Sequence, residues 1–486
     1  MKQASRFEII MARMWNLLNE GKPFTPIFVL SVFIIYHMAD LDLAKFFYAV
    51  LFTSPVMAIY YKYDFPLHLR WFLWVPLLAA GFGFGIGPFS QYILAFGLFI
   101  FFTVFFWGTL YYHLRIGTPW TNFLRIWKLF LLNTDSTSGN VGEQVPKVFL
   151  QLLLMQGVYE LSAPLNVLPQ YLIFSIALLV FSWFIHRWFF NWKPEEYPSY
   201  VEPSSEQQQP LAKRMVIVVI DGCRKERLYE ASAPFLHRLM KGGTVYENME
   251  TIYPARTVTC FSSMFTGTYT WEHGIKSNMV WDLGVKVESI FDVLKKQGRK
   301  GVLFGCAHLI DAFGDHVESF TAVSHNDVVD KKIIEQAKRI YEREEPDLFV
   351  VQMIAVDQTG HSRGVLYPEY LQKIQESDAL IADFYQWLEN RGSMEDTAFL
   401  IMADHGQGNG IGGHGHLDTG ERFVPFFMHG PMIQKGKVIH EKHSIVSLAS
   451  TISTLLGVPI PDHARGPVLH DALQYEQDKH RHSGVS

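Results

Sequence analysis

Hydrophobic positions divide the chain into two parts of different character. From about residue 24 to residue 190, Phe, Leu, Ile, Trp and Tyr dominate, whereas the chain from about residue 210 onward has the pattern of a water-soluble protein. A helix needs about 20 apolar residues to cross a bilayer. Candidate spans are therefore the windows 25–39, 43–61, 71–87, 90–112 and 168–189. The pattern predicts a membrane domain of about five helices.

Two further apolar stretches lie between the last two of these windows. Residues 119–132, "PWTNFLRIWKLFLL", mix Trp, Arg and Lys with apolar residues, which is typical of a helix lying in the membrane interface. Residues 148–160 are apolar but too short to span a bilayer. We expect them to form a re-entrant or surface segment.

Basic residues beside the windows predict the orientation of the membrane domain. They precede the first window (Lys2, Arg6, Arg13, Lys22), separate the second from the third (Lys62, Arg70) and follow the fourth (Arg115, Arg125, Lys128). The connections "ADLD" and "GIGPFSQ" carry none. Because Lys and Arg favour the cytoplasmic side, the N-terminus is predicted to be cytoplasmic. Five spans then put everything after residue 190 outside, although Arg187 and Lys193 depart from this scheme.

The second part of the chain alternates apolar runs with helical patterns. It follows a segment rich in Pro, Ser, Glu and Gln at 194–213, which has the composition of a linker. Buried strands are predicted at 215–222, 346–357 and 397–406, with amphipathic helices between them. This alternation predicts an α/β domain whose mostly parallel sheet is sandwiched by helices.

Acidic residues and histidines recur where these strands end. In a parallel sheet the ligand site lies beyond the carboxyl ends of the strands. Asp221 ends the first strand, and Asp404 and His405 end the third. Asp357 ends the second strand and His361 follows four residues later. A glycine-rich stretch, "GQGNGIGGHGHLDTG", then carries two more histidines, His414 and His416.

This collection of side chains predicts a metal site. Carboxylate oxygens and imidazole nitrogens suit zinc and similar divalent ions. Without a cation, several acidic groups at one sheet edge repel one another. The set is large enough for two metal ions, the arrangement that holds the attacking and leaving oxygens in phosphoryl transfer.

Charge and cysteine content exclude other classes of function. The formal net charge is -5, whereas binding to nucleic acid needs a concentrated basic face. The chain has 3 cysteines at no repeating spacing, which argues against a disulfide framework and a cysteine-based zinc site. We therefore expect no binding of nucleic acid.

The second part resembles the alkaline phosphatase superfamily, and within it the type I phosphodiesterase/nucleotide pyrophosphatase family. Glycolipid ethanolamine-phosphate transferases are related to this family. The resemblance spans most of residues 215–470 and covers none of the membrane part. The motifs that carry it, in the order of the family, are "VIDGCR", "YPARTVTCFSSMFTGTYTWEHGI", "DQTGHSRG", "ADHGQGNGIGGHGH", "VPFFMHGP" and "ISTLLGVPIPDHARGPVL".

The resemblance implies a role for individual residues. Thr257, three residues after a proline, matches the nucleophile of the family. The implied ligands of one metal are Asp221, Thr257, Asp404 and His405, and those of the other are Asp357, His361 and His414. His416 is the alternative to His414. Asn278 is a candidate for lining the substrate pocket, and both metals are expected to be zinc.

Three hypotheses for the function follow from these residues. The first is a membrane-anchored phosphodiesterase that hydrolyses phosphodiester or pyrophosphate bonds through a phospho-threonine. The second is a transferase that moves phosphoethanolamine or phosphoglycerol from a phospholipid to an envelope glycan or glycolipid, which the several spans favour. The third, an inactive binding module, is disfavoured because every implied ligand is present.

The expected organisation follows from both parts of the chain. A membrane domain occupies 1–193 and a linker 194–213, before an alkaline-phosphatase-like catalytic domain at 214–475 and a polar tail at 476–486. We expect an integral protein of a bacterial plasma membrane, with the catalytic domain outside the cytoplasm. Its predicted partners are the lipid bilayer and a phosphodiester or phospholipid-derived substrate.

Overall fold

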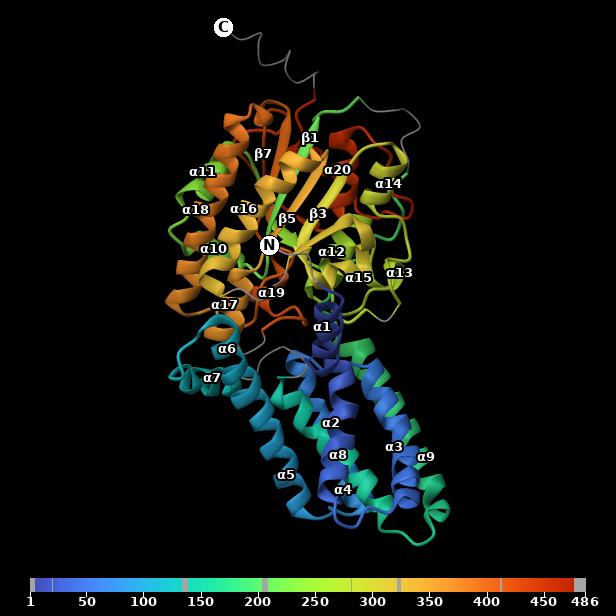
Figure 1. Cartoon of the computed structure of the whole chain (residues 1–486). Coiled ribbons are helices and arrows are strands. Elements are labelled where there is room, and N and C mark those ends of the chain that lie inside the picture. Colours follow the sequence, from blue (N-terminus) through green and yellow to red (C-terminus); the bar gives the residue numbers. More distant parts are fainter. Residues whose placement is uncertain are drawn as a thin grey trace.

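The computed structural model places a helical bundle against one end of an α/β domain (Figure 1). It describes residues 5–19, 21–132, 139–202, 209–280, 282–320, 325–410 and 413–475. The predicted polar tail at 476–486 lies outside the described residues.

Apolar helices build the bundle. They are α1 (Arg6–Asn19), α2 (Gly21–Tyr36), α3 (Leu43–Lys62), η1 (Leu67–Leu73), α4 (Trp74–Phe84), α5 (Phe89–Ile100), η2 (Phe101–Tyr111), α6 (Tyr112–Ile116), α7 (Asn122–Leu131), α8 (Val141–Tyr159), η3 (Pro164–Val167) and α9 (Leu168–Phe189). Within the described residues, helical stretches long and apolar enough to cross a membrane are Leu43–Lys62, Leu67–Phe84, Phe89–Ile116 and Pro164–Phe189. These coincide with four predicted windows, and the remaining window falls on the shorter apolar helix Lys22–Tyr36.

Helix α8 lies inside the bundle, in contact with α2, α3, α4 and α5. The expectation of a re-entrant or surface segment at 148–160 is therefore wrong. Buried polar side chains lower the hydropathy of this helix, but they find partners within the bundle. The Lys147 ammonium pairs with the Glu143 carboxylate, and the Thr25 hydroxyl donates to Gln144 at 2.7 Å. Pairing of this kind lets ionisable groups lie among membrane helices.

Hydrogen bonds at the two ends of α8 define the ends of the bundle. At the catalytic end, which faces the α/β domain, the Phe65 amide donates to Glu143 at 3.2 Å. At the distal end, His37 Nε2 lies 2.9 Å from Gln156 Oε1, and the Asp42 amide donates to Tyr159 at 2.8 Å. Helix α8 therefore runs the full length of the bundle, as Figure 1 also shows.

The described chain runs between these two ends along α2, α3, η1–α4, α5–η2, α8 and α9 in turn. An even number of passes returns the chain to its starting side. Helix α1 indeed contacts the α/β domain, where Arg13 pairs with Asp311. The structure therefore puts α1 and the α/β domain at the same end of the bundle, whereas the sequence-based scheme put them on opposite sides of a membrane and did not include α8.

An eight-stranded sheet forms the centre of the α/β domain, in the order β4-β3-β5-β1-β6-β7-β2-β8. Strand β7 is antiparallel to both of its neighbours, and the other pairs are parallel. The strands are β1 (Arg214–Ile220), β2 (Thr244–Glu250), β3 (Gly301–Cys306), β4 (Val317–Phe320), β5 (Leu348–Met353), β6 (Thr397–Met402), β7 (Phe426–His429) and β8 (Lys437–Ser444). The predicted mostly parallel sheet is confirmed.

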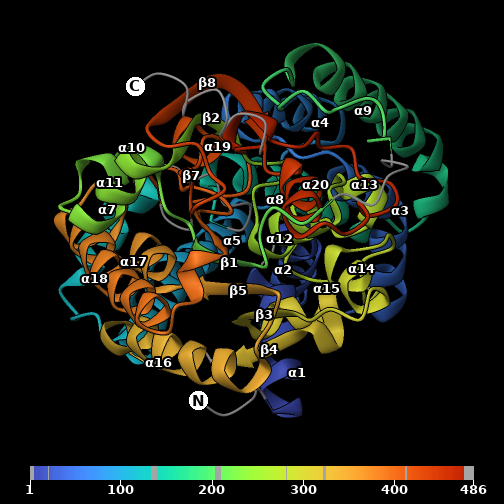
Figure 2. The ribbon, with the colours of Figure 1, turned by 90° about the horizontal axis from the view of Figure 1, so that it is seen from above.

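Helices cover both faces of this sheet (Figure 2). One face carries α11 (Pro234–Gly242), α16 (Asn326–Glu344) and α18 (Pro368–Asn390), and the other carries α12 (Thr257–Thr266), α14 (Ile290–Lys296) and α20 (Ser447–Leu456). The remaining helices are α10 (Lys225–Glu230), α13 (Thr270–His273), η4 (Ala307–Leu309), α15 (Ile310–Phe313), η5 (Gly314–His316), α17 (Ala355–Arg363), η6 (Ser393–Glu395), α19 (Thr419–Arg422) and η7 (His470–Ala472).

The carboxyl ends of the central strands point toward the bundle. Helices α12, α17 and α19, which follow or flank these ends, lie at the bottom of the α/β domain in Figure 1. Strands β5 and β6 are buried at every residue, and β1 between them is buried at every residue after the first. The fold therefore places the predicted site at the junction between the two domains.

Candidate metal centre

Thr257 is the first residue of α12, and Arg256 is the N-cap. The Thr257 side chain is buried, and its Oγ1 lies 3.3 Å from His405 Nε2. Neighbouring hydroxyls have structural partners: Ser262 donates to the Val258 carbonyl at 2.7 Å, and Thr251 donates to the Asp404 carbonyl at 2.6 Å. Thr257 is therefore the hydroxyl of this stretch that lies beside the strand-end histidine.

A first group of candidate ligands consists of Asp221, Asp404 and His405, whose ligand atoms lie within 4.8 Å of one another. His405 Nε2 is 3.5 Å from Asp221 Oδ1 and 3.4 Å from Asp404 Oδ2. Both carboxylate oxygens are buried without a hydrogen-bond donor in the described structure. Two carboxylate oxygens thus lie close to the same imidazole nitrogen, an arrangement in which all three atoms could bind one cation.

Burial makes this group electrostatically unfavourable without a cation. The pKa of Asp221 is raised well above its usual value by burial and by the charges of Asp404 and Asp357. Burial also raises the pKa of Asp404, although the neighbouring His405 opposes this effect. A divalent ion between the carboxylates would remove the repulsion that causes these shifts.

A second group consists of Asp357, His405 and His414. His361 joins it, because its Nε2 is 3.3 Å from Asp357 Oδ2 and 3.2 Å from His414 Nε2. The rings of His405 and His414 stack with centroids 4.0 Å apart. His405 thus lies between the two groups, whereas the sequence-based scheme gave it to one of them.

Protonation of the second group follows from these contacts. The pKa of His414 is held well below its usual value by burial and by the charges of His405 and His361. Burial tends to raise the pKa of Asp357, but His361, His414 and His405 outweigh it and lower that pKa. A neutral His414 imidazole beside an ionised Asp357 carboxylate has the protonation states that metal ligands need.

Asp357 and His361 come from a helix and not from the end of a strand. Strand β5 ends at Met353, and both residues lie on α17, four positions apart. Side chains four residues apart share one face of a helix, so the two ligand candidates point the same way. The sequence-based placement of Asp357 at the strand end is therefore wrong, because the residue lies in the first turn of the helix that follows the strand.

His414 and His416 have different surroundings. His414 Nδ1 lies 2.8 Å from the Ala255 carbonyl, which leaves Nε2 facing His361. His416 belongs to neither group of ligand atoms in the described structure, and its carbonyl accepts from Trp192 Nε1 at 3.0 Å. Burial lowers the pKa of His416 to about 4. The geometry favours His414 as the candidate ligand.

Supporting residues that the sequence analysis did not find hold these side chains in place. Gln352 donates to Asp221 at 2.7 Å, and the Gln407 amide donates to the Asp357 carboxylate and carbonyl. Glu421, fully buried, accepts the amides of residues 415, 416 and 417 at 2.7–3.0 Å. Partners of this kind orient metal ligands. No local motif marks them, because each acts on a residue distant in sequence or through the backbone.

Asn278 lies beside the nucleophile helix. Its Oδ1 accepts the amide of Val258, the second residue of α12, at 2.9 Å. The side chain that the resemblance suggested for substrate binding is therefore next to Thr257, where it fixes the start of the helix.

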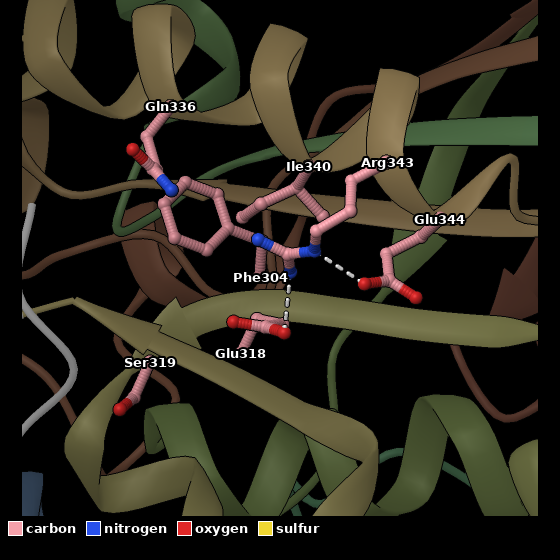
Figure 3. A pocket seen from close by; sticks show the side chains of 7 residues that line it. All are labelled: Phe304, Glu318, Ser319, Gln336, Ile340, Arg343 and Glu344. Atoms are coloured by element: carbon pink, nitrogen blue, oxygen red, sulfur yellow. Dashed lines mark hydrogen bonds and ion pairs between the residues drawn. The ribbon is translucent and has the colours of Figure 1, made fainter.

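A pocket lies elsewhere on the α/β domain, between α16 and the strands β3 and β4 (Figure 3). Arg343 in this pocket pairs with Glu318 at 2.7 Å and also with Glu344. Its charge is neutralised, and none of the candidate ligands lines the pocket. The pocket is separate from the metal centre.

Buried carboxylates and imidazoles gathered at the carboxyl edge of an α/β sheet are an arrangement that suits divalent metal ions. Residues 215–301 and 305–442 match the model of the family "Type I phosphodiesterase / nucleotide pyrophosphatase". This match confirms the resemblance that the motifs indicated.

Curated relatives fall into two groups. The catalytic subunit of GPI ethanolamine phosphate transferase 3 of Homo sapiens is 27% identical over 299 residues, which cover 56% of this chain and 27% of the relative. Ectonucleotide pyrophosphatase/phosphodiesterase family member 1 of Homo sapiens is 24% identical over 213 residues, which cover 39% of this chain and 23% of the relative. The chain thus spans less than a third of either relative.

Two solved structures are similar to part of this chain. Murine ectonucleotide pyrophosphatase / phosphodiesterase 5 is 14% identical, with a TM-score of 0.47, and covers 54% of this chain and 100% of its own. Wild-type alkaline phosphatase PafA is 12% identical, with a TM-score of 0.45, and covers 55% of this chain and 99% of its own.

Proposed function

We propose that this chain is a membrane-anchored, metal-dependent phosphodiesterase in which Thr257 attacks the phosphorus of a phosphodiester. The observation that carries the proposal is the position of Thr257 Oγ1, 3.3 Å from His405 Nε2 and at the start of a helix. The amides at a helix N-terminus favour a bound phosphate. The match to a phosphodiesterase family model supports the same reaction.

The donor set fits two divalent ions, which we expect to be zinc. Asp221, Thr257, Asp404 and His405 would hold one ion, and Asp357, His361 and His414 the other. The buried oxygens of Asp221 and Asp404 without a hydrogen-bond donor support this assignment. When bound, the ions lower the pKa of the threonine hydroxyl and stabilise charge on the phosphoryl oxygens.

The reaction exchanges bonds at phosphorus in two steps. Thr257 Oγ1 loses its proton to solvent and forms a bond to phosphorus, while the bond from phosphorus to the leaving alcohol breaks. The alcohol takes up a proton from water, and the chain carries a phospho-threonine. Water then attacks the same phosphorus and loses a proton to solvent, while the bond from phosphorus to Thr257 Oγ1 breaks and Oγ1 takes up a proton. Asn278 holds the start of α12 in place during both steps.

A second candidate function is transfer of a phospho-alcohol from a phospholipid to an acceptor hydroxyl. It differs only in the second step, in which the acceptor replaces water. The observation that favours it is the location of the site at the bundle. Trp192, just after the last membrane helix, donates to the His416 carbonyl, and Tyr253, four residues before the nucleophile, donates to Asp64 of the bundle at 3.1 Å. A lipid is therefore a plausible phosphodiester donor.

Proteoliposomes separate the two functions. We expect protein reconstituted with phospholipid labelled in its head group to release diacylglycerol, with the label appearing in water-soluble phosphate or on an added acceptor glycan. Label in the aqueous phase alone supports hydrolysis, and label on the acceptor supports transfer. Cleavage of a soluble aryl phosphodiester without formation of diacylglycerol would contradict a lipid donor and leave the phosphodiesterase proposal intact.

The interfacial helix α7 contacts the helix that carries two candidate ligands. Asn122 donates to the Ser362 carbonyl at 2.8 Å and accepts from Arg363 at 3.0 Å. Arg125 pairs with Glu369 at 2.8 Å. Ser362 and Arg363 are the last two residues of α17 and directly follow His361.

We expect Asn122→Leu to weaken binding of the second metal ion by about 10- to 100-fold, the usual effect of losing a partner that orients a ligand. Both hydrogen bonds of the buried Asn122 are lost, while the branched shape of the side chain and its number of heavy atoms are kept. Competition with a chelator measures the affinity. The neighbouring Thr121→Ala, at an exposed position, is the control. Equal affinity in the two variants would show that α7 does not position α17.

The protein is membrane-associated by its long apolar helices. A bacterial plasma membrane, zinc as the metal and the acceptor class are proposals that rest on the family resemblance. They are tested by metal analysis of the purified protein and by lipid analysis of cells that lack it.

A further inference from the structure

The distal end of the bundle is acidic. Its connections, at residues 37–42, 85–88 and 160–167, carry Asp40, Asp42 and Glu160 and no Lys or Arg. Hydrogen bonds from Tyr159 to the Asp40 carbonyl and from the Asp42 amide to Tyr159 hold two of these connections together. The nearest basic residue in sequence is Lys45, in the first turn of α3.

The catalytic end of the bundle is basic at every connection. Each segment that leaves or enters a membrane helix there carries Lys or Arg, and α1 adds more. These residues are Arg6, Arg13, Lys22, Lys62, Arg70, Arg115, Arg125, Lys128, Arg187 and Lys193. All the connections at this end therefore carry basic residues, whereas the only charged residues in the connections at the distal end are acidic.

Docking of the α/β domain accounts for only part of this charge. Arg13 and Arg125 pair with acidic residues of that domain. In contrast, Lys62 and Arg115 lie over the rings of Tyr63 and Tyr111, within the bundle's own helical segments, at 5.5 and 6.0 Å from the ring centroids. Tyrosine beside a basic residue at a helix end is typical of a membrane–water interface.

The sequence-based scheme placed these same residues on two sides of the membrane. With five passes, Arg187 and Lys193 fall on the side opposite to Lys62 and Arg70. With the additional pass made by α8, whose ends contact Phe65 and His37, all of them lie on one side. The distribution in the connections then follows the preference of Lys and Arg for the cytoplasm, and Lys45 in the first turn of α3 is the basic residue near the distal end.

We propose that the catalytic domain and helix α1 lie on the cytoplasmic side of the membrane, and that the acidic distal connections face outward. This inference rests on the path of the bundle and on charge, and it is independent of the proposed reaction. It reverses the orientation expected from five spans. The substrate therefore reaches the metal centre from the cytoplasmic side.

Single cysteines at the two ends test this orientation in the full-length protein. Ser162, in the distal connection, and Ser199, after α9 and before the α/β domain, are both exposed. Cys223 and Cys260 are buried and Cys306 is partly buried, so the unsubstituted protein is the control for labelling. A membrane-impermeant maleimide is added to intact cells and, separately, to permeabilised cells.

We expect the maleimide to label Ser162→Cys in intact cells. We expect it to label Ser199→Cys only after the cells are permeabilised. Labelling of Ser199→Cys in intact cells would overturn the proposal, as would protection of Ser162→Cys. Protease treatment gives a second measurement without substitution. Cleavage of the 194–213 linker in inside-out vesicles but not in intact cells supports the proposal, and the reverse pattern contradicts it.

Discussion

Replacement of Thr257 by alanine is expected to lower turnover of an aryl phosphodiester by about a thousandfold or more, which is the scale seen when a nucleophile is removed. The variant loses the only atom that we assign to the bond with phosphorus. The substitution removes a hydroxyl and a methyl group from one buried position at the start of α12. The carboxylates and imidazoles around it keep their supporting contacts.

Two measurements distinguish this result from a folding defect. Thr257→Ala should retain both metal ions and the thermal unfolding midpoint of the parent protein, because Asp221, Asp404 and His405 remain. Thr257→Ser keeps a hydroxyl and should retain part of the activity. Thr259→Ser, which alters a buried hydroxyl residue two positions further along α12, is the matched control. Full activity in Thr257→Ala would remove the proposed nucleophile.

Replacement of His414 by alanine is expected to lower activity by about a hundredfold or more and to remove one metal ion per chain, since loss of a direct ligand should exceed the 10- to 100-fold effect of losing an outer partner. Its Nε2 faces His361, and its ring stacks on His405 at 4.0 Å. The ion held by Asp357 and His361 would keep too few ligands. The other ion should remain.

His416→Ala is the matched comparison, two residues away in the same loop. Its ring is outside both groups of ligand atoms in the described structure, and the contact with Trp192 uses its backbone carbonyl, which alanine keeps. We expect this variant to retain both ions. Loss of an ion in His416→Ala, with retention in His414→Ala, would assign the ligand to the other histidine. Metal analysis of the purified proteins gives the answer.

Much of the candidate site could be predicted from the sequence because it depends on local patterns. Apolar runs that end in Asp221 and Asp404 indicate buried parallel strands, and the carboxyl ends of such strands meet at one edge of a sheet. The family resemblance indicated Thr257, three residues after a proline, and α12 begins there. Four apolar windows match long helices because their hydropathy is also a local property of the sequence.

The tertiary structure decided what depends on contacts between distant residues. Hydropathy averages over a window, so the polar side chains of α8 hide its pass through the bundle, although Lys147 and Glu143 neutralise each other there. The position of His405 between both ligand groups also requires the loop that returns His414 over the sheet edge. Glu421 shapes that loop through backbone amides.

The sequence by itself thus determined a membrane part, a mostly parallel α/β domain and the side chains of a metal centre. It did so because hydrophobic periodicity and strand-end chemistry are local properties of the chain. Only the tertiary structure decided the path of α8 through the bundle, the different surroundings of His414 and His416, and the contact of Asn122 with α17. These depend on which buried polar groups find partners far away in the sequence, and no local pattern records that pairing.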